Sequence, residues 1–124
     1  MTQQPDDLVT EVRHLGTSVQ IAISGELDIA SSPAVRRQLA DLLRNRPEIA
    51  VVDLRNVGFI DSSGIHALLA ARRHAIAAGT HFIVIRPTGV ADRVFTLSGL
   101  ADVFPPLEHV EGSAAGTPES SRAA

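Results

Sequence analysis

The sequence predicts an α/β fold, in which a mixed β-sheet of about five strands carries three or four packed helices. Val19, Ile21 and Ile23 alternate with smaller or polar residues, which is the period of a half-buried strand. Two later apolar runs, 49–54 and 81–85, are typical of strands covered on both faces in a parallel sheet. Amphipathic segments separate these strands. The alternation therefore favours an open sheet with right-handed crossovers.

The first half of the chain is predicted to begin with a hairpin. Residues 8–14 supply its first strand and residues 15–17 its turn. A loop is expected at 25–28. Ser31-Ser32-Pro33 then marks a helix start, because Ser caps helices and Pro suits their first turn. This helix should end near Pro47, with an apolar stripe formed by Val35, Leu39, Leu42 and Leu43.

The second half repeats the strand-to-helix pattern. A segment at 55–64 leads into a second helix, which Gly79 should end as a C-cap. Arg72 lies near the centre of its apolar stripe, where its side chain either snorkels or pairs with an acid. The predicted stripe of this helix is Ile65, Leu68, Leu69 and Ile76. A short helix with Val90, Val94 and Leu97 on one face should follow, and then an edge strand with Val103, Phe104 and Leu107.

Composition limits the chemistry that this chain can perform. Its 124 residues suffice for one domain with a real core. It has no Cys, so it has no disulfide, thiolate metal site or thiol nucleophile. All 11 of its basic residues are Arg, so a Schiff-base or P-loop lysine is absent. A net charge of −3 and only 3% aromatic residues argue against nucleic-acid binding.

The chain divides into three expected parts. Residues 1–7 form a loose arm, 8–111 a single domain, and 112–124 a disordered tail of small polar residues. No apolar run is long enough to span a membrane, and the polar, acidic N-terminus does not read as a secretory signal, so a cytoplasmic location is expected. The domain holds 11 acids and 10 bases, so it is nearly neutral and should recognise a partner by shape and local groups.

The candidate functional segment is Asp61-Ser62-Ser63-Gly64, between a strand and a helix. It permits two interpretations. Asp61 or Ser62 can simply cap the unpaired N–H groups of the helix. An exposed hydroxyl at that position can also accept a phosphoryl group, which adds about −1.5 to −2 of charge. A catalytic Ser is disfavoured, because the sequence lacks a nucleophile elbow and a base near the serine in sequence other than His66.

The run Val51-Val52-Asp53-Leu54 and the segment 57–65 around this motif resemble the signature of bacterial anti-sigma factor antagonists of the STAS superfamily. Gly25-Glu26-Leu27-Asp28 resembles a loop of that family, and residues 94–100 resemble its third helix and cap. The similarity extends over about residues 8–107. It implies a STAS-type sheet with helices packed on it.

The resemblance also implies a function. Ser62 would be phosphorylated by an anti-sigma factor that is also an ATP-dependent serine kinase. The unphosphorylated chain would bind that kinase and free the sigma factor, and a serine phosphatase would reverse the modification. The implied partner-binding residues are Asp28, Asp61, Ser62, Ser63 and Gly64. The chain itself would be no enzyme and would need no cofactor or metal.

Several alternatives stay open at this point. Asp28 can merely begin a turn, Ser63 can be a helix-start hydroxyl, and Gly64 can serve close backbone approach. His66 and His74 are eight positions apart on one helix and are expected to be surface residues rather than metal ligands. A second possible function is that of a STAS-type accessory subunit of a lipid or organic-solvent ABC transporter.

Overall fold

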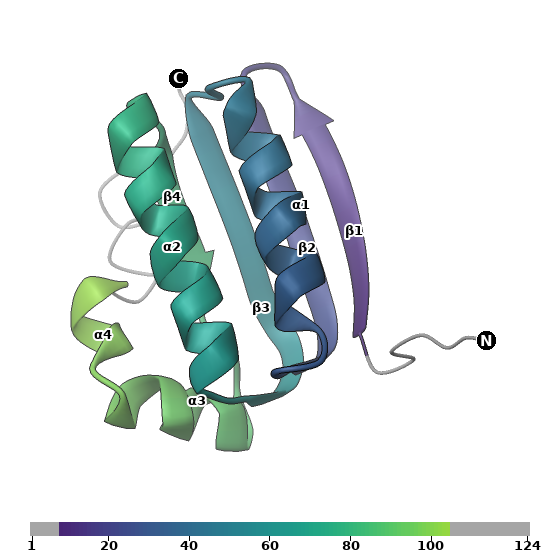
Figure 1. The fold of residues 1–124 in the computed structure, drawn as a ribbon, viewed down its shortest axis with the longest axis vertical. Helices are drawn as coiled ribbons and strands as arrows, with labels where there is room; N and C mark the ends of the chain where they lie inside the picture. The colour runs from purple at the N-terminus through teal and green to yellow at the C-terminus, as the bar shows by residue number, and fades with distance from the viewer. Residues whose placement is uncertain (1–7, 105–124) are drawn as a thin grey trace.

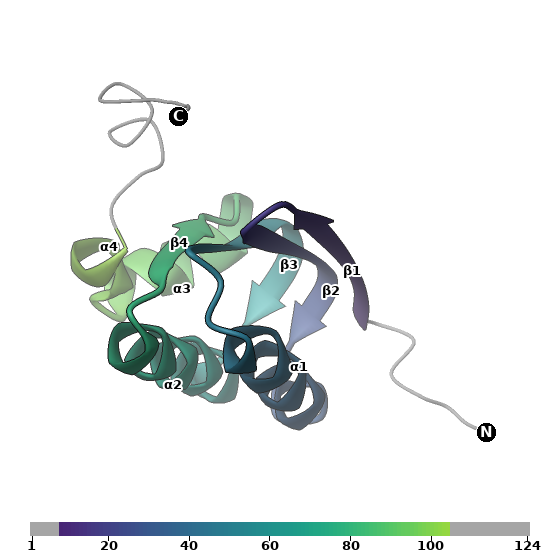
Figure 2. The ribbon, with the colours of Figure 1, turned by 90° about the horizontal axis from the view of Figure 1, so that it is seen from above.

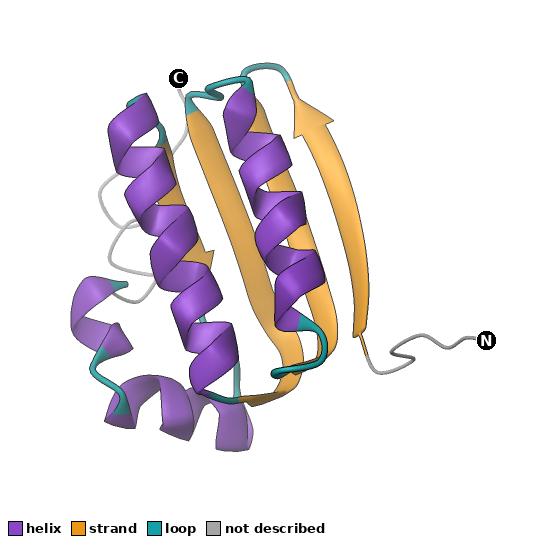
Figure 3. Cartoon of the chain, viewed as in Figure 1, coloured by secondary structure: helices purple, strands orange, loops and turns teal. Residues whose placement is uncertain are grey.

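A computed structural model describes residues 8–104, in which a mixed four-stranded sheet carries helices (Figures 1 and 3). The strands lie in the order β1-β2-β3-β4. This architecture confirms the predicted fold class, with one strand fewer than expected. The expectations for 1–7, Leu107 and 112–124 lie outside the described residues. The strands are β1 (Leu8–Leu15), β2 (Ser18–Leu27), β3 (Ile49–Ile60) and β4 (His81–Ile85), and the helices are α1 (Ser32–Arg44), α2 (Ser62–Ala78), α3 (Gly89–Leu97) and α4 (Leu100–Val103).

Strands β1 and β2 form the predicted antiparallel hairpin, from the pair Leu15 and Ser18 to the pair Leu8 and Gly25. Strand β3 then pairs in parallel with both β2 and β4. The β2–β3 ladder is longer than predicted. The segment at 25–28 was expected to be a loop and that at 55–64 to lead into the second helix, but most of their residues continue the two strands through register shifts. Bulges of this kind bend a strand and alter where its end points.

Helices α1 and α2 lie side by side on one face of the sheet (Figures 1 and 2). The strand residues facing them are fully buried, whereas Ile49 and His81 on the other side are exposed. Asp53, on the same face as Ile49, is buried, so the expected cover of the inner strands on both faces is only partial on the side away from α1 and α2. The core beneath the helices includes Val19, Ile21, Ile23, Val52, Leu54 and Val84 from the strands and Val35, Leu39 and Leu43 from α1.

The inward face of α2 differs from the predicted stripe. Ile76 is 60% exposed, and the buried positions are mostly small ones. Of the predicted stripe, Leu68 is fully buried and Ile65 and Leu69 are partly buried against the core, whereas Ile76 lies on the exposed flank of the helix. Arg72 is half-buried on this flank beside Ile76, and within residues 8–104 it takes part in no ion pair. The residues that α2 buries are Gly64, Ala67, Leu68, Ala71 and Ala75.

The last two helices also correct the sequence interpretation. Helix α3 buries Ala91 and Phe95, while Val90 and Leu97 of the predicted stripe are exposed. Val103, expected in an edge strand with Phe104 and Leu107, instead ends the short helix α4, which follows Gly99 in the left-handed region at φ 85°. Phe104 packs its ring against Phe82 and Phe95.

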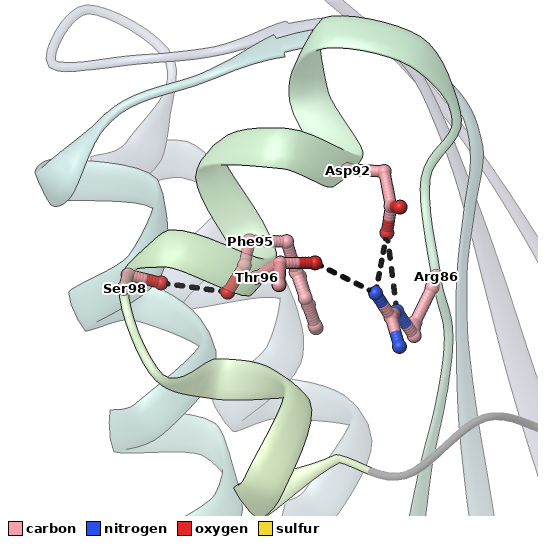
Figure 4. A network of polar contacts seen from close by, with 5 residues as sticks. All are labelled: Arg86, Asp92, Phe95, Thr96 and Ser98. Carbon is pink, nitrogen blue, oxygen red and sulfur yellow. Dashed lines mark hydrogen bonds and ion pairs between the residues drawn. The ribbon is translucent and has the colours of Figure 1, made fainter.

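A polar network around Arg86 anchors α3 to the end of β4 (Figure 4). Its Nη2 donates to Asp92 Oδ1 at 2.8 Å and to Thr96 Oγ1 at 2.9 Å, and its Nε also donates to Asp92. The guanidinium lies over the ring of Phe95, 5.4 Å from its centroid. Arg86 thereby joins three side chains of one helix.

Within 8–104, no helix is long and apolar enough to cross a membrane.

Candidate functional site

The candidate site lies where β2 and β3 end together. Leu27 and Ile60 are partners in the parallel ladder, and Asp28 and Asp61 each follow directly in sequence. The N–H of Asp61 donates to the carbonyl of Leu27 at 3.2 Å, which ties the two segments to each other. Two segments more than thirty residues apart in sequence thus meet at one edge of the sheet, where α1 and α2 both begin (Figure 1).

Asp61 is the N-cap of α2. Its Oδ1 accepts hydrogen bonds from the backbone N–H of Ser63 at 2.9 Å and of Gly64 at 3.2 Å. Its backbone is extended, as is usual for a cap, and the helix starts at the next residue. Of the two capping residues that the sequence allowed, Asp61 therefore has this role, and the hydroxyl of Ser62 is not needed for it.

Ser62 is the first residue of α2 and is exposed, whereas Ser63 is half-buried. Among the hydrogen bonds formed within 8–104, none involves the Ser62 hydroxyl. The hydroxyl stands at the positive end of the helix dipole, where an added anion is stabilised. This geometry suits a phosphoacceptor, while the charge of Asp61 opposes the modification.

Asp28 organises the neighbouring loop. Its Oδ1 accepts from the N–H groups of Ala30 at 3.0 Å and Ser31 at 3.1 Å. The hydroxyl of Ser31 donates to the carbonyl of Glu26 at 2.8 Å. Asp28 thus begins a turn, as one of its two interpretations required. The same turn leaves the loop beside Asp61, so a role of Asp28 in starting the turn does not exclude a role in binding a partner.

Gly64 is buried, and it is where α2 meets β2 most closely. A Cβ at this position would lie 2.6 Å from the carbonyl oxygen of Leu27 and 2.9 Å from a side-chain carbon of Ile60. Only glycine fits this approach without a shift of the backbone. Gly64 therefore positions Ser62 and presents no side chain of its own to a partner.

Two exposed apolar side chains that the sequence analysis did not single out lie close to the motif residues in sequence. Ile29, next to Asp28, is 75% exposed, and Phe59, two residues before Asp61, is 41% exposed. Exposed large apolar side chains grouped in this way mark interaction surfaces. The signal in the sequence was their position: both stand beside the motif residues, at strand ends.

The ion pair between Asp53 and Arg55 lies along β3 before the site. Arg55 donates to Asp53 through Nε at 3.0 Å and through Nη2 at 2.8 Å. These hydrogen bonds lower the pKa of the Asp53 carboxyl below its ordinary value of 3.8, against the opposing effect of burial.

His66 and His74 are both exposed, and the described part of the chain holds no cluster of metal-ligating side chains.

Comparison with known proteins identifies the class. The STAS domain family model matches residues 9–114, and the chain belongs to this family. The chain is 32% identical over 101 residues to the anti-sigma-F factor antagonist RsfB of Mycobacterium tuberculosis, a match that covers 81% of each chain. It is 30% identical to the anti-sigma F factor antagonist of Paenibacillus polymyxa, over 80% of this chain and 86% of that one.

Solved structures agree with this assignment. The crystal structure of an anti-sigma factor antagonist from Mycobacterium paratuberculosis superposes with a TM-score of 0.73 at 29% identity, covering 85% of this chain and 89% of the other. The unphosphorylated form of the anti-sigma factor antagonist SpoIIAA has the same fold, with a TM-score of 0.69 at 21% identity over 86% of this chain and 100% of that one.

Proposed function

We propose that this chain is an anti-sigma factor antagonist controlled by phosphorylation of Ser62. In the unphosphorylated state it binds an anti-sigma factor that is also a serine kinase, and the sigma factor is released. The observation that carries the proposal is the exposed Ser62 hydroxyl at the start of α2, beside the Asp28 loop, in a chain related to named antagonists.

The transfer itself requires little of this chain. The kinase moves the γ-phosphoryl group of ATP to Ser62 Oγ, ADP leaves, and the hydroxyl proton passes to a base on the kinase. This chain supplies the hydroxyl and a docking surface around Asp28, Ile29 and Phe59. It therefore acts as a regulator and substrate in the cytoplasm, where ATP and sigma factors are found, and not as an enzyme.

Phosphorylation switches binding through local charge. The phosphate takes the formal charge of the chain from −3 to about −5, and the change is concentrated at one helix end. The α2 dipole favours the phosphate within this chain, so the fold tolerates it. A partner surface closed over Ser62 would have to accommodate a dianion and would be expelled. A serine phosphatase would then restore the binding form.

Capture from the source cell tests this proposal, with Ser62→Ala as bait and Ser62→Asp as the matched charged variant. Ser62→Ala should retain an anti-sigma factor kinase, and Ser62→Asp should lose it. With the purified kinase and labelled ATP, wild type and Ser63→Ala should be labelled and Ser62→Ala should not. Equal labelling of Ser62→Ala would show that the acceptor is another residue.

The transporter accessory subunit remains the alternative class. Capture of a permease and its ATPase by the same bait, in place of an anti-sigma factor, would favour it. The named relatives support the antagonist instead.

A further inference from the structure

The domain is nearly neutral overall, but its positive charges are concentrated on helices α1 and α2. Helices α1 and α2 together carry five arginines and one aspartate, and the 17 residues of α2 include no carboxylate. The other described residues contain five arginines and eight acids. The helical layer thus has a formal charge of +4 on a chain whose total charge is −3.

A groove of about 260 Å³ runs between the two helices on this basic layer. Its walls consist of alanines, of which Ala67 is fully buried and Ala71 is 6% exposed. Neither helix contains Phe, Tyr or Trp. Arg36, Arg37 and His74 stand along the groove, whose remaining lining residues are Ala40, Ala67, Ala70 and Ala71.

The arginines of this groove are available to a partner. Arg36 and Arg37 are exposed, and the ion pairs found within residues 8–104 use Arg44, Arg55 and Arg86 instead. The groove begins close to the candidate site. Arg36 lies four residues after Ser32, the first residue of α1, and Ala67 lies five residues after Ser62, the first residue of α2, a rise of roughly 6–8 Å along each helix.

We propose that this groove binds an acidic amphipathic helix of the anti-sigma factor, so that the partner contacts both Ser62 and the α1–α2 layer. Small apolar side chains of that helix would lie against the alanines, and its carboxylates would face Arg36 and Arg37. Nucleic acid fits the groove less well, because four of its seven lining residues are alanines and the His74 imidazole is the one ring among them for base stacking. The inference rests on the proposed function and adds the chemistry of the partner.

Charge complementarity of this kind acts chiefly on the rate of association and on its salt dependence. The test titrates the anti-sigma factor captured by Ser62→Ala against the full chain at low and high salt. The double variant Arg36→Glu/Arg37→Glu should bind about 10-fold more weakly at low salt and lose most of the salt dependence. Arg13→Glu, with its exposed side chain on β1, is the control for charge reversal and should bind as wild type does.

A second variant tests the groove apart from its charge. Ala70→Leu places a large side chain in the groove and should weaken binding at every salt concentration. Circular dichroism of each variant checks that it is folded. Unchanged binding of the kinase by either groove variant would overturn the inference. It would also be overturned if Arg36→Glu/Arg37→Glu abolished binding to a 20-base-pair DNA or a 20-nucleotide RNA and left binding to the kinase unchanged. If wild type binds the kinase and Ser62→Asp does not, the proposed function stands even where the groove variants bind as wild type does.

Discussion

The Cα of Gly64 faces the backbone carbonyl of Leu27 so closely that any side chain would collide with it. The nearest approach of a Cβ would be 2.6 Å, to a backbone atom that cannot rotate away. This contact fixes the start of α2 against the end of β2. The position of Ser62 relative to Asp28 therefore depends on the absence of a single carbon atom.

Gly64→Ala should destabilise the fold by about 2 kcal/mol, because the added methyl group must push α2 and β2 apart. Urea unfolding followed by circular dichroism measures the change. Gly58→Ala is the matched control, since a Cβ at Gly58 has no atom within 4 Å. Equal stability of the two variants would mean that the approach at Gly64 relaxes without cost.

Asp61→Ala should cost about 1 kcal/mol, because two N–H groups at the start of α2 lose their acceptor. Asp61→Asn keeps a side-chain oxygen in the same position and should lose much less stability. The midpoint of urea unfolding distinguishes the two. The cap assignment fails if the Ala and Asn variants are equally stable.

Stability should fall in acid partly through Asp53. Its pKa is lowered in the folded state, so its contribution is present above the ordinary value of 3.8 and is lost as the pH falls through the folded pKa. Arg55→Gln removes the main cause of the shift and should flatten this part of the profile. Urea midpoints between pH 7 and pH 3 measure it. Arg44→Gln breaks an ion pair between two largely exposed side chains and should have little effect on stability. A steep acid profile that survives in Arg55→Gln would assign it to other groups.

Arg86→Lys should loosen α3, because an ammonium group cannot reproduce the paired contacts to Asp92 and Thr96. We expect a loss of about 1–2 kcal/mol and faster amide hydrogen exchange in α3. Arg93→Lys on the same helix is the control, since Arg93 is exposed and joins none of the ion pairs seen among residues 8–104. Unchanged exchange in Arg86→Lys would show that packing of Phe95 alone holds the helix.

The hairpin and the order of strands and helices up to α3 were predictable because each depends on local sequence. Alternation marked β2, and Pro33 and Gly79 marked helix ends. The faces of α2 and α3 were not predictable in this way. Helical spacing placed Ile76 and Leu97 on the buried faces, but both side chains are exposed. The packing of the helices on the sheet buries Ala67, Ala71 and Phe95 as well.

At the candidate site too, local sequence predicted some features, and long-range strand pairing determined the others. The sequence alone indicated a helix start at 61–64 but allowed both Asp61 and Ser62 as its cap. The proximity of Asp28 followed only from family resemblance, because it arises from the pairing of Leu27 with Ile60. Long-range register of this kind leaves no local signal. The length of β3 was missed for a related reason, since its bulged end pairs through positions that resemble a loop.

The hydrogen bond from Asp61 to the Leu27 carbonyl has a consequence for engineering. Since the proposed recognition segments around Asp28 and Asp61 are tied together at one edge of the sheet, grafting only one of them from a relative would produce a mismatched pair. A chimera that is to switch partners should exchange residues 26–31 and 59–64 together. The recognition unit proposed for this chain is thus discontinuous in sequence.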